Sequence, residues 1–276
     1  MKRNRYSSLA FAAVVALGLV ASSLAVAAID CPGYTPAPNS VVIAPRVWND
    51  CPASTLTLIN NYPALVSMND TDVECMGWTN LHVWALSENS NTPAVFENCS
   101  HYRFSAIFNG NLSGAGVGEG GLRLSPWWSL QADGRFMARI GGNGEIACFG
   151  GRLPFYSFTG AYGVTYTPGT DMLMGIIYDP NSLTLADPAT ITYYIAIGGN
   201  WYSSGPIAFD QGNPAEGHGE YGELSPAQVG GFLQEPNGSG GALFNFTGQW
   251  KNISFEGSSA TPASQKTWGQ LKSIYR

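Results

Sequence analysis

Residues 242–257, ALFNFTGQWKNISFEG, carry the pattern that decides the fold class. Their apolar side chains alternate with polar ones, as they do along a β-strand that buries one face. The alternation has two phases, with Phe244, Phe246 and Trp250 in the first and Ile253 and Phe255 in the second. One extra residue exchanges the two faces of a strand, so a β-bulge near Lys251 and Asn252 would return these side chains to a single buried face. The stretch therefore predicts one long, bulged β-strand.

Similar strand-like runs recur along the rest of the chain. Clusters of Gly, Pro, Asn and Asp separate them, such as GGNG, TPGT, DPNS and GSGG, and these clusters favour turns. The runs occupy residues 81–86, 102–108, 117–124, 135–140, 145–149, 172–178, 189–197 and 228–234. A chain of 276 residues with 34 glycines and only 12% charged residues suits short strands and tight turns. We therefore predict an all-β fold, a single large β-sandwich of two antiparallel sheets.

Residues 1–28 have the three parts of a secretory signal peptide. The basic start, the apolar middle and the small-x-small cleavage site are Lys2 to Arg5, Phe11 to Val20 and Ala25 to Ala27. The alternative is an uncleaved membrane anchor, which the alanine-rich composition and the cleavage site disfavour. We expect cleavage near Ala27 or Ala28 and a protein that is secreted or held at the cell surface.

The mature chain then divides into a sandwich domain, residues 29–258, and a linker with a short C-terminal tail, residues 259–276. Within the tail, Trp268, Leu271 and Ile274 fall at helical spacing. The tail is either a helix docked on the sandwich or a recognition tag for export or surface attachment.

The net charge limits the partners. It is −6 for the full sequence, and removal of the three basic residues of the signal peptide leaves about −9. A phosphate backbone requires the opposite balance, so nucleic acid is a poor partner. No other stretch is long and apolar enough to span a bilayer, so we expect no membrane span in the mature chain.

Five cysteines in an exported chain predict two disulfides and one unpaired thiol. The four disulfide candidates are Cys31, Cys51, Cys75 and Cys99, and they can pair in three ways. Cys148 lies in a strand-like run, EIACFGG, and is expected to be a buried small hydrophobe and not a nucleophile.

Several segments resemble those of known sandwich proteins. The number of strands, the glycine-bracketed acid of GEGGLRL and the closing strand FTGQWKNISF are similar to the concanavalin A-like lectin and glucanase sandwich. The blocks SPWWS, DGRF, GEIACFGGRLPFYSF and GNPAEG resemble an uncharacterised group of exported bacterial proteins with that architecture. The resemblance covers most of residues 40–257. It implies two curved antiparallel sheets with a concave face that often holds sugar in relatives, and it carries no activity by itself.

Two neighbouring strands supply the strongest candidate for a binding site. On residues 117–124 and 135–140, the polar side chains alternate with apolar ones, so pairing of the two strands would gather the polar ones on one face. The predicted ligand-binding residues are Glu119, Arg123, Arg135 and Arg139 on that face and Trp127 and Trp128 at its rim. Sugar rings bind on flat aromatic surfaces, and arginine forks hold hydroxyls or carboxylates. The alternative is structural: the tryptophans cover an open sheet end, and the arginines pair with Glu119, Asp133 and Glu145.

The same segment argues against catalysis. The glucanase relatives place their carboxylates along one strand as Glu-x-Asp-x-x-Glu, and this chain has no such run. Glu119 stands alone, and a carboxylate beside Arg123 stays ionised, which is the wrong state for a general acid. An enzyme would need a second acid from another strand, such as Asp133 or Glu145. We therefore assign no catalytic residue.

Two further segments hold candidate ligands and aromatics. Asp210, Asn213 and Glu216 could offer oxygens to calcium, the only cofactor that we consider. Glu216, His218 and Glu220 alternate as a metal site could require, although three glycines there favour a loop. Trp201 and Tyr202 are expected in a turn, where they either join a binding surface or cap the core.

These observations favour an exported, non-catalytic module that binds a glycan or another cell-surface polymer. A glycan-degrading enzyme, either a glycoside hydrolase or a lyase, is the first alternative. The second is a structural surface protein that has no small ligand.

Overall fold

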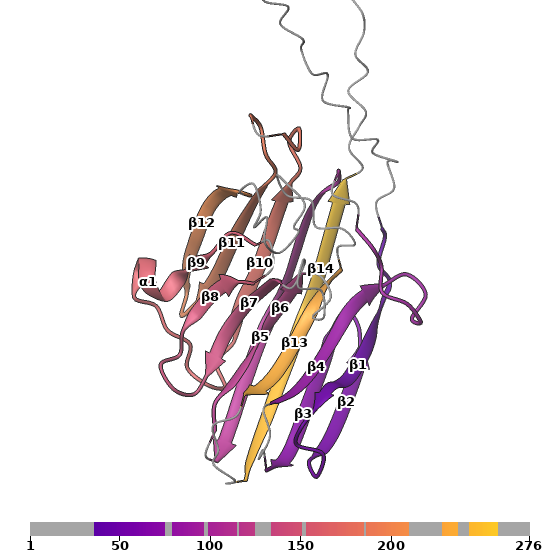
Figure 1. Ribbon diagram of the computed structural model, residues 1–276, viewed down its shortest axis with the longest axis vertical. Coiled ribbons are helices and arrows are strands. Elements are labelled where there is room, and N and C mark those ends of the chain that lie inside the picture. The colour runs from indigo at the N-terminus through magenta and orange to yellow at the C-terminus, as the bar shows by residue number, and fades with distance from the viewer. Residues whose placement is uncertain are drawn as a thin grey trace, which may run out of the picture. The chain divides into compact units, whose positions relative to one another are not determined.

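A computed structural model describes residues 36–74, 79–96, 99–114, 116–124, 134–150, 153–184, 186–209, 228–236 and 243–258. These residues form two seven-stranded antiparallel sheets (Figure 1). In sheet A the strand order is β1-β4-β13-β6-β7-β8-β9, and in sheet B it is β12-β11-β10-β5-β14-β3-β2. The predicted all-β sandwich of two antiparallel sheets is thereby confirmed.

The strands of sheet A are β1 (Ser40–Asn49), β4 (Thr79–Ser87), β13 (Val229–Pro236), β6 (Gly118–Leu124), β7 (Gly134–Ile140), β8 (Ile146–Phe149) and β9 (Tyr156–Ser157). Those of sheet B are β12 (Asn200–Ala208), β11 (Thr190–Ile197), β10 (Met172–Asp179), β5 (His101–Gly114), β14 (Phe244–Ser258), β3 (Leu65–Val73) and β2 (Thr55–Asn61). One helix is described, α1 (Phe158–Tyr162). Among the described residues, no helix is long and apolar enough to cross a membrane.

Strand β14 shows the predicted bulge. Its pairing with β5 shifts register between Lys251 and Ser254, and Asn252 has a positive φ of 50°. Asparagine tolerates this left-handed backbone better than most residues. The shift returns Ile253 to the interior that Phe246 and Trp250 already occupy, with Ile253 buried among the core residues.

Two tryptophans join the sheets in the core. The rings of Trp84 on β4 and Trp250 on β14 meet edge to face, with their centroids 5.8 Å apart. The indole Nε1–H of Trp250 donates a hydrogen bond of 2.9 Å to the backbone oxygen of Gly121 on β6. A side chain at Gly231 would collide with both indoles, so a glycine is required where the two rings meet. The contacts between the sheets are therefore aromatic and closely packed.

The structure describes three of the five cysteines. Cys148 on β8 is a free thiol with no exposed surface, and burial raises its pKa well above the ordinary value. Cys51 and Cys99 are disulfide-bonded. Cys31 and Cys75 lie outside the described residues, so the pairing stays open.

Candidate functional sites

The polar residues predicted to share a face do so on sheet A. Strands β6 and β7 pair in a register that places Glu119 opposite Arg139 and Arg123 opposite Arg135. Side chains at directly paired positions point to the same side of a sheet, so all four lie on the face of sheet A that points away from sheet B. We call these four residues the arginine face.

Within the arginine face the charges bind one another. An Oε1 atom of Glu119 accepts a hydrogen bond of 3.1 Å from Nη2 of Arg139, and its Oε2 lies 3.7 Å from Nη1 of Arg135. Arg139 also lies 4.0 Å from Glu145. Glu119 and Arg123 are only 8% and 5% exposed. The pairing of arginines with Glu119 and Glu145 matches the structural alternative stated above, and ligand binding at this face stays a prediction.

Other predicted site residues lie outside the described residues. These are Trp127, Trp128 and Asp133 near the arginine face, and the candidate metal ligands Asp210, Asn213, Glu216, His218 and Glu220. The structure therefore tests neither the tryptophan rim nor the calcium site.

A cluster that the sequence did not suggest lies between the sheets. Asp70 on β3, His82 on β4 and Glu235 on β13 have no exposed surface, and their potential metal-ligating atoms lie within 4.8 Å of one another. We call these three residues the buried triad. One carboxylate, one imidazole and a second carboxyl are also the donor types of many metal sites, so their protonation states decide what the triad can do.

The position of the ring proton of His82 argues against a metal. The backbone N–H of Arg46 donates a hydrogen bond of 3.0 Å to His82 Nδ1, so Nδ1 holds a lone pair and the proton is on Nε2. Nε2 in turn lies 3.1 Å from Oδ2 of Asp70, to which it donates. A metal-bound histidine instead donates from its second nitrogen to a carbonyl or carboxylate. The triad is therefore a hydrogen-bonded cluster in which Nε2 cannot also ligate an ion.

The two carboxyl groups of the triad have opposite pKa shifts. Burial raises the pKa of Asp70, but hydrogen bonds from His82, Ser54 and Asn80 outweigh it and leave the pKa below its ordinary value. Burial raises the pKa of Glu235 well above its ordinary value, and the charge of Asp70 raises it further. Neither oxygen of Glu235 has a hydrogen-bond partner among the described residues. Asp70 thus carries the charge of the cluster, and the protonated form of Glu235 is favoured.

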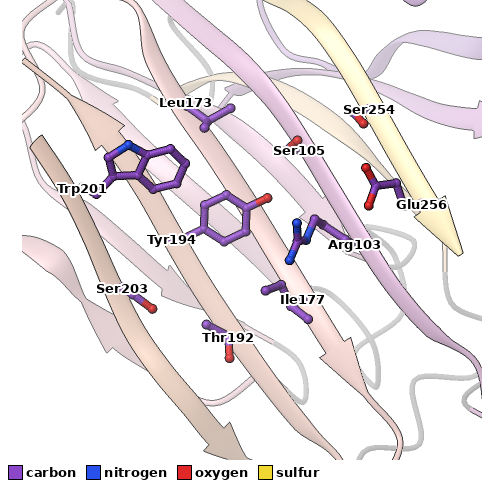
Figure 2. A pocket seen from close by; sticks show the side chains of 10 residues that line it. All are labelled: Arg103, Ser105, Leu173, Ile177, Thr192, Tyr194, Trp201, Ser203, Ser254 and Glu256. Carbon is purple, nitrogen blue, oxygen red and sulfur yellow. The ribbon is translucent and has the colours of Figure 1, made fainter. Parts of the chain in front are cut away.

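An open groove crosses the outer face of sheet B. Its volume is about 460 Å³, and side chains from five adjacent strands line it (Figure 2). From β12 to β14 these side chains are Trp201, Ser203, Thr192, Tyr194, Leu173, Ile177, Ser105, Arg103, Ser254 and Glu256. The groove and the arginine face belong to different sheets, so they are separate candidate sites.

The alternation of β11 explains how the groove is built. Ile191, Tyr193 and Ile195 are buried in the core, while Thr192 and Tyr194 between them point outward. Gly175 on β10 lies directly opposite Tyr194, and a Cβ atom at this position would collide with the far end of the tyrosine ring. The glycine therefore lets the ring of Tyr194 lie across the neighbouring strand.

An aromatic pair occupies one end of the groove. The rings of Tyr194 and Trp201 are nearly parallel, with centroids 5.9 Å apart and planes inclined by 23°. Trp201 is 67% exposed. Burial raises the pKa of Tyr194, although Ser105 and Arg103 act in the opposite direction, so its hydroxyl stays protonated as a hydrogen-bond donor. The sequence placed Trp201 in a turn, but it lies in β12 and faces outward.

A charged pair occupies the other end. Arg103 and Glu256 lie directly opposite each other on β5 and β14. Within the described residues they form no ion pair with each other at 4.0 Å or less, and Arg103 extends along the groove toward Tyr194 (Figure 2). Both side chains are exposed and keep hydrogen-bonding capacity for a ligand. They were not predicted from the sequence, because two single charged residues far apart in the chain give no sign that their strands pair.

Comparisons with known proteins bear on the architecture alone. No known family and no curated protein matches the chain. Among solved structures, family 7 alginate lyase A1-II′ in complex with substrate is 8% identical, with a TM-score of 0.47 over 83% of this chain and 97% of that one. The Emp47p carbohydrate recognition domain is 9% identical, with a TM-score of 0.36 over 80% of this chain and 93% of its own. Peanut lectin is 10% identical, with a TM-score of 0.33 over 81% of this chain and 95% of its own. At these scores the matches carry no argument about function.

Proposed function

We propose that this chain is an exported, non-catalytic module that binds a neutral glycan in the groove of sheet B. One observation carries the proposal: the exposed indole of Trp201 lies beside the ring of Tyr194 on the floor of an open groove. Export follows from the signal peptide expected at residues 1–28 and is part of the proposal.

The chemistry of the groove supports a sugar ligand. A sugar ring has an apolar C–H face and a rim of hydroxyls, and it buries the first on an aromatic surface while the second forms hydrogen bonds. The rings of Trp201 and Tyr194 offer the aromatic surface at little cost in conformational entropy. Arg103 donates and Glu256 accepts hydrogen bonds, and a hydroxyl can use both.

The charge balance supports a neutral ligand. The positive charge of Arg103 is offset by Glu256 on the adjacent strand. The chain as a whole has a net charge of −6, which repels a polyanion at long range. A hydroxyl-rich, uncharged chain fits both facts.

The state of Glu119 weighs against the alternative of a glycan-degrading enzyme. Its carboxyl group accepts a hydrogen bond from Arg139, so it is engaged in a contact within the sheet and not directed at a scissile bond. The groove of sheet B has a single carboxylate among its lining residues, whereas glycoside hydrolysis normally uses two.

Truncation of Trp201 tests the proposal. Isothermal titration of neutral oligosaccharides against the mature protein should reveal a ligand, and Trp201→Ala should weaken its binding by about thirtyfold or more, the loss typical of a buried aromatic anchor. Phe155→Ala is the matched control, because Phe155 is 70% exposed and lies outside the groove.

Arg139→Ala separates the two candidate sites. The variant should bind normally if the groove is the site. Loss of binding in Arg139→Ala with full retention in Trp201→Ala would contradict the proposal and move the site to the arginine face.

A further inference from the structure

A second hollow adjoins the charged end of the groove. It has a volume of about 290 Å³ and is lined by His101, Arg103, Glu256 and Gly257. Arg103 and Glu256 line both hollows, so this cross-strand pair stands at the boundary between them. His101 begins β5, two residues before Arg103, and its Nε2 lies 3.2 Å from Oδ1 of Asp179 on β10.

The groove is long in one direction. The lining of the groove runs over β12, β11, β10, β5 and β14, which are successive strands of sheet B. Four spacings between adjacent strands amount to about 19 Å, and the direction of this span is across the strands. A span of this length is several times the width of one sugar ring.

The chemistry changes along this span. Aromatic rings line the β12 and β11 end, and apolar Leu173 and Ile177 line the middle (Figure 2). The donor Arg103 and the acceptor Glu256 follow at the β5 and β14 end. The imidazole of His101 lies two residues from Arg103 along β5 and lines the second hollow. A single ring could contact only one of these zones at a time.

We infer that the ligand is a linear glycan chain laid across the strands of sheet B, with one ring on Trp201 and a later ring between Arg103 and Glu256. The inference rests on the proposed function and adds the length of the ligand and its path. The ring at the boundary accepts hydrogen bonds from the guanidinium and donates one to the carboxylate, which a hydroxyl-bearing sugar does without a net charge. From there the chain turns along β5 into the hollow of His101.

Titration with oligosaccharides of increasing length tests the inference. The probes are the cello-, xylo-, manno- and N-acetylchito-oligosaccharide series, from the monosaccharide to the hexasaccharide. In the series that binds, the affinity should rise with length and level off once the chain spans both hollows. Arg103→Ala and Glu256→Gln should weaken binding of the longest member by about tenfold, and that of the shortest binding member by less than about twofold. Asp72→Asn, which neutralises an exposed carboxylate on β3, is the control for charge.

The outcomes separate the two proposals. If Trp201→Ala abolishes binding but the affinity is the same at every length, the extended path is overturned and the proposed function stands. An equal loss at every length in Arg103→Ala also overturns the path, because the boundary would then belong to the same subsite as Trp201. If none of the series binds, or if binding ignores Trp201→Ala, the proposed function itself fails.

Discussion

The buried triad and the groove of sheet B contain similar side chains but have different roles. The triad holds two carboxyl groups and the groove holds one, and each has a nearby arginine and polar side chains from several strands. In the triad, which water cannot reach, Asp70 must keep its hydrogen bonds, because an unpaired buried charge is costly. In the groove, Arg103 and Glu256 are exposed and form no ion pair with each other among the described residues, so their hydrogen-bonding groups are available to a ligand. Burial thus separates a polar group that stabilises the fold from one that can recognise something else.

The largest expected effect is on the stability of the triad. His82→Ala removes the Nε2–H group that donates a hydrogen bond to Asp70. Loss of one partner of a buried charge lowers the unfolding free energy by about 3 kcal/mol. Chemical denaturation measures this change. His101→Ala is the control, because His101 forms an exposed pair with Asp179 and should change stability by less than about 0.5 kcal/mol. Equal effects in the two variants would remove the contrast between the sites.

A smaller effect is expected beneath the groove. Gly175→Ala places a Cβ atom against the ring of Tyr194, which can swing outward because that side of the sheet is open. We expect a loss of about 1 kcal/mol in stability and a larger loss in glycan affinity, since the aromatic pair is displaced. Calorimetry of unfolding and of binding measures both. In the Tyr194→Ala background the same glycine substitution should have little further effect, and a full additional loss would show that the clash lies elsewhere.

The third prediction concerns the pH dependence of stability, and here the substitution is expected to stabilise the protein. Because the pKa of Glu235 is raised in the folded protein, its contribution to stability is fully present below the unfolded value near 4.5 and is lost as the pH rises toward the folded value. Glu235→Gln removes this loss, so the variant should be more stable than the parent at neutral pH. The gain follows the size of the rise in the pKa of Glu235. Unfolding curves recorded from below pH 4.5 to neutral pH provide the measurement.

The control is Glu74→Gln, which replaces an exposed carboxyl group. The unfolding free energy of this variant should depend on pH as that of the parent does. If Glu235→Gln has a profile parallel to that of the parent, Glu235 is ionised in the folded protein, and the account of the triad given above is wrong.

The strands were predictable wherever one face is buried and the other is not. The alternation in residues 242–257 located β14 and its bulge, and the polar alternation on β6 and β7 placed Glu119 and the arginines on one face. Strands β2 and β3 were not predicted, because β2 is exposed on nearly all of its positions and β3 carries polar residues that face the interior. Periodicity reports only the contrast between two faces, so it fails where that contrast is weak.

The candidate sites were less predictable because they depend on contacts between distant strands. The arginines predicted to bind a ligand belong to one hairpin, and two of them, Arg135 and Arg139, contact Glu119. Asp70, His82 and Glu235 belong to no motif, and they meet because β4 pairs with β13 while β3 packs across from them in the other sheet. Arg103 and Glu256 meet only through the register of β5 and β14. Single residues on separate strands give no local signal.

The free thiol of Cys148 gives this protein an internal probe of its own opening. With no surface exposed and a pKa raised by burial, the sulfur is shielded from alkylating reagents in the native state. A reagent can reach the sulfur only after β8 separates from sheet B. The rate of labelling at this atom therefore measures how often the sandwich opens locally.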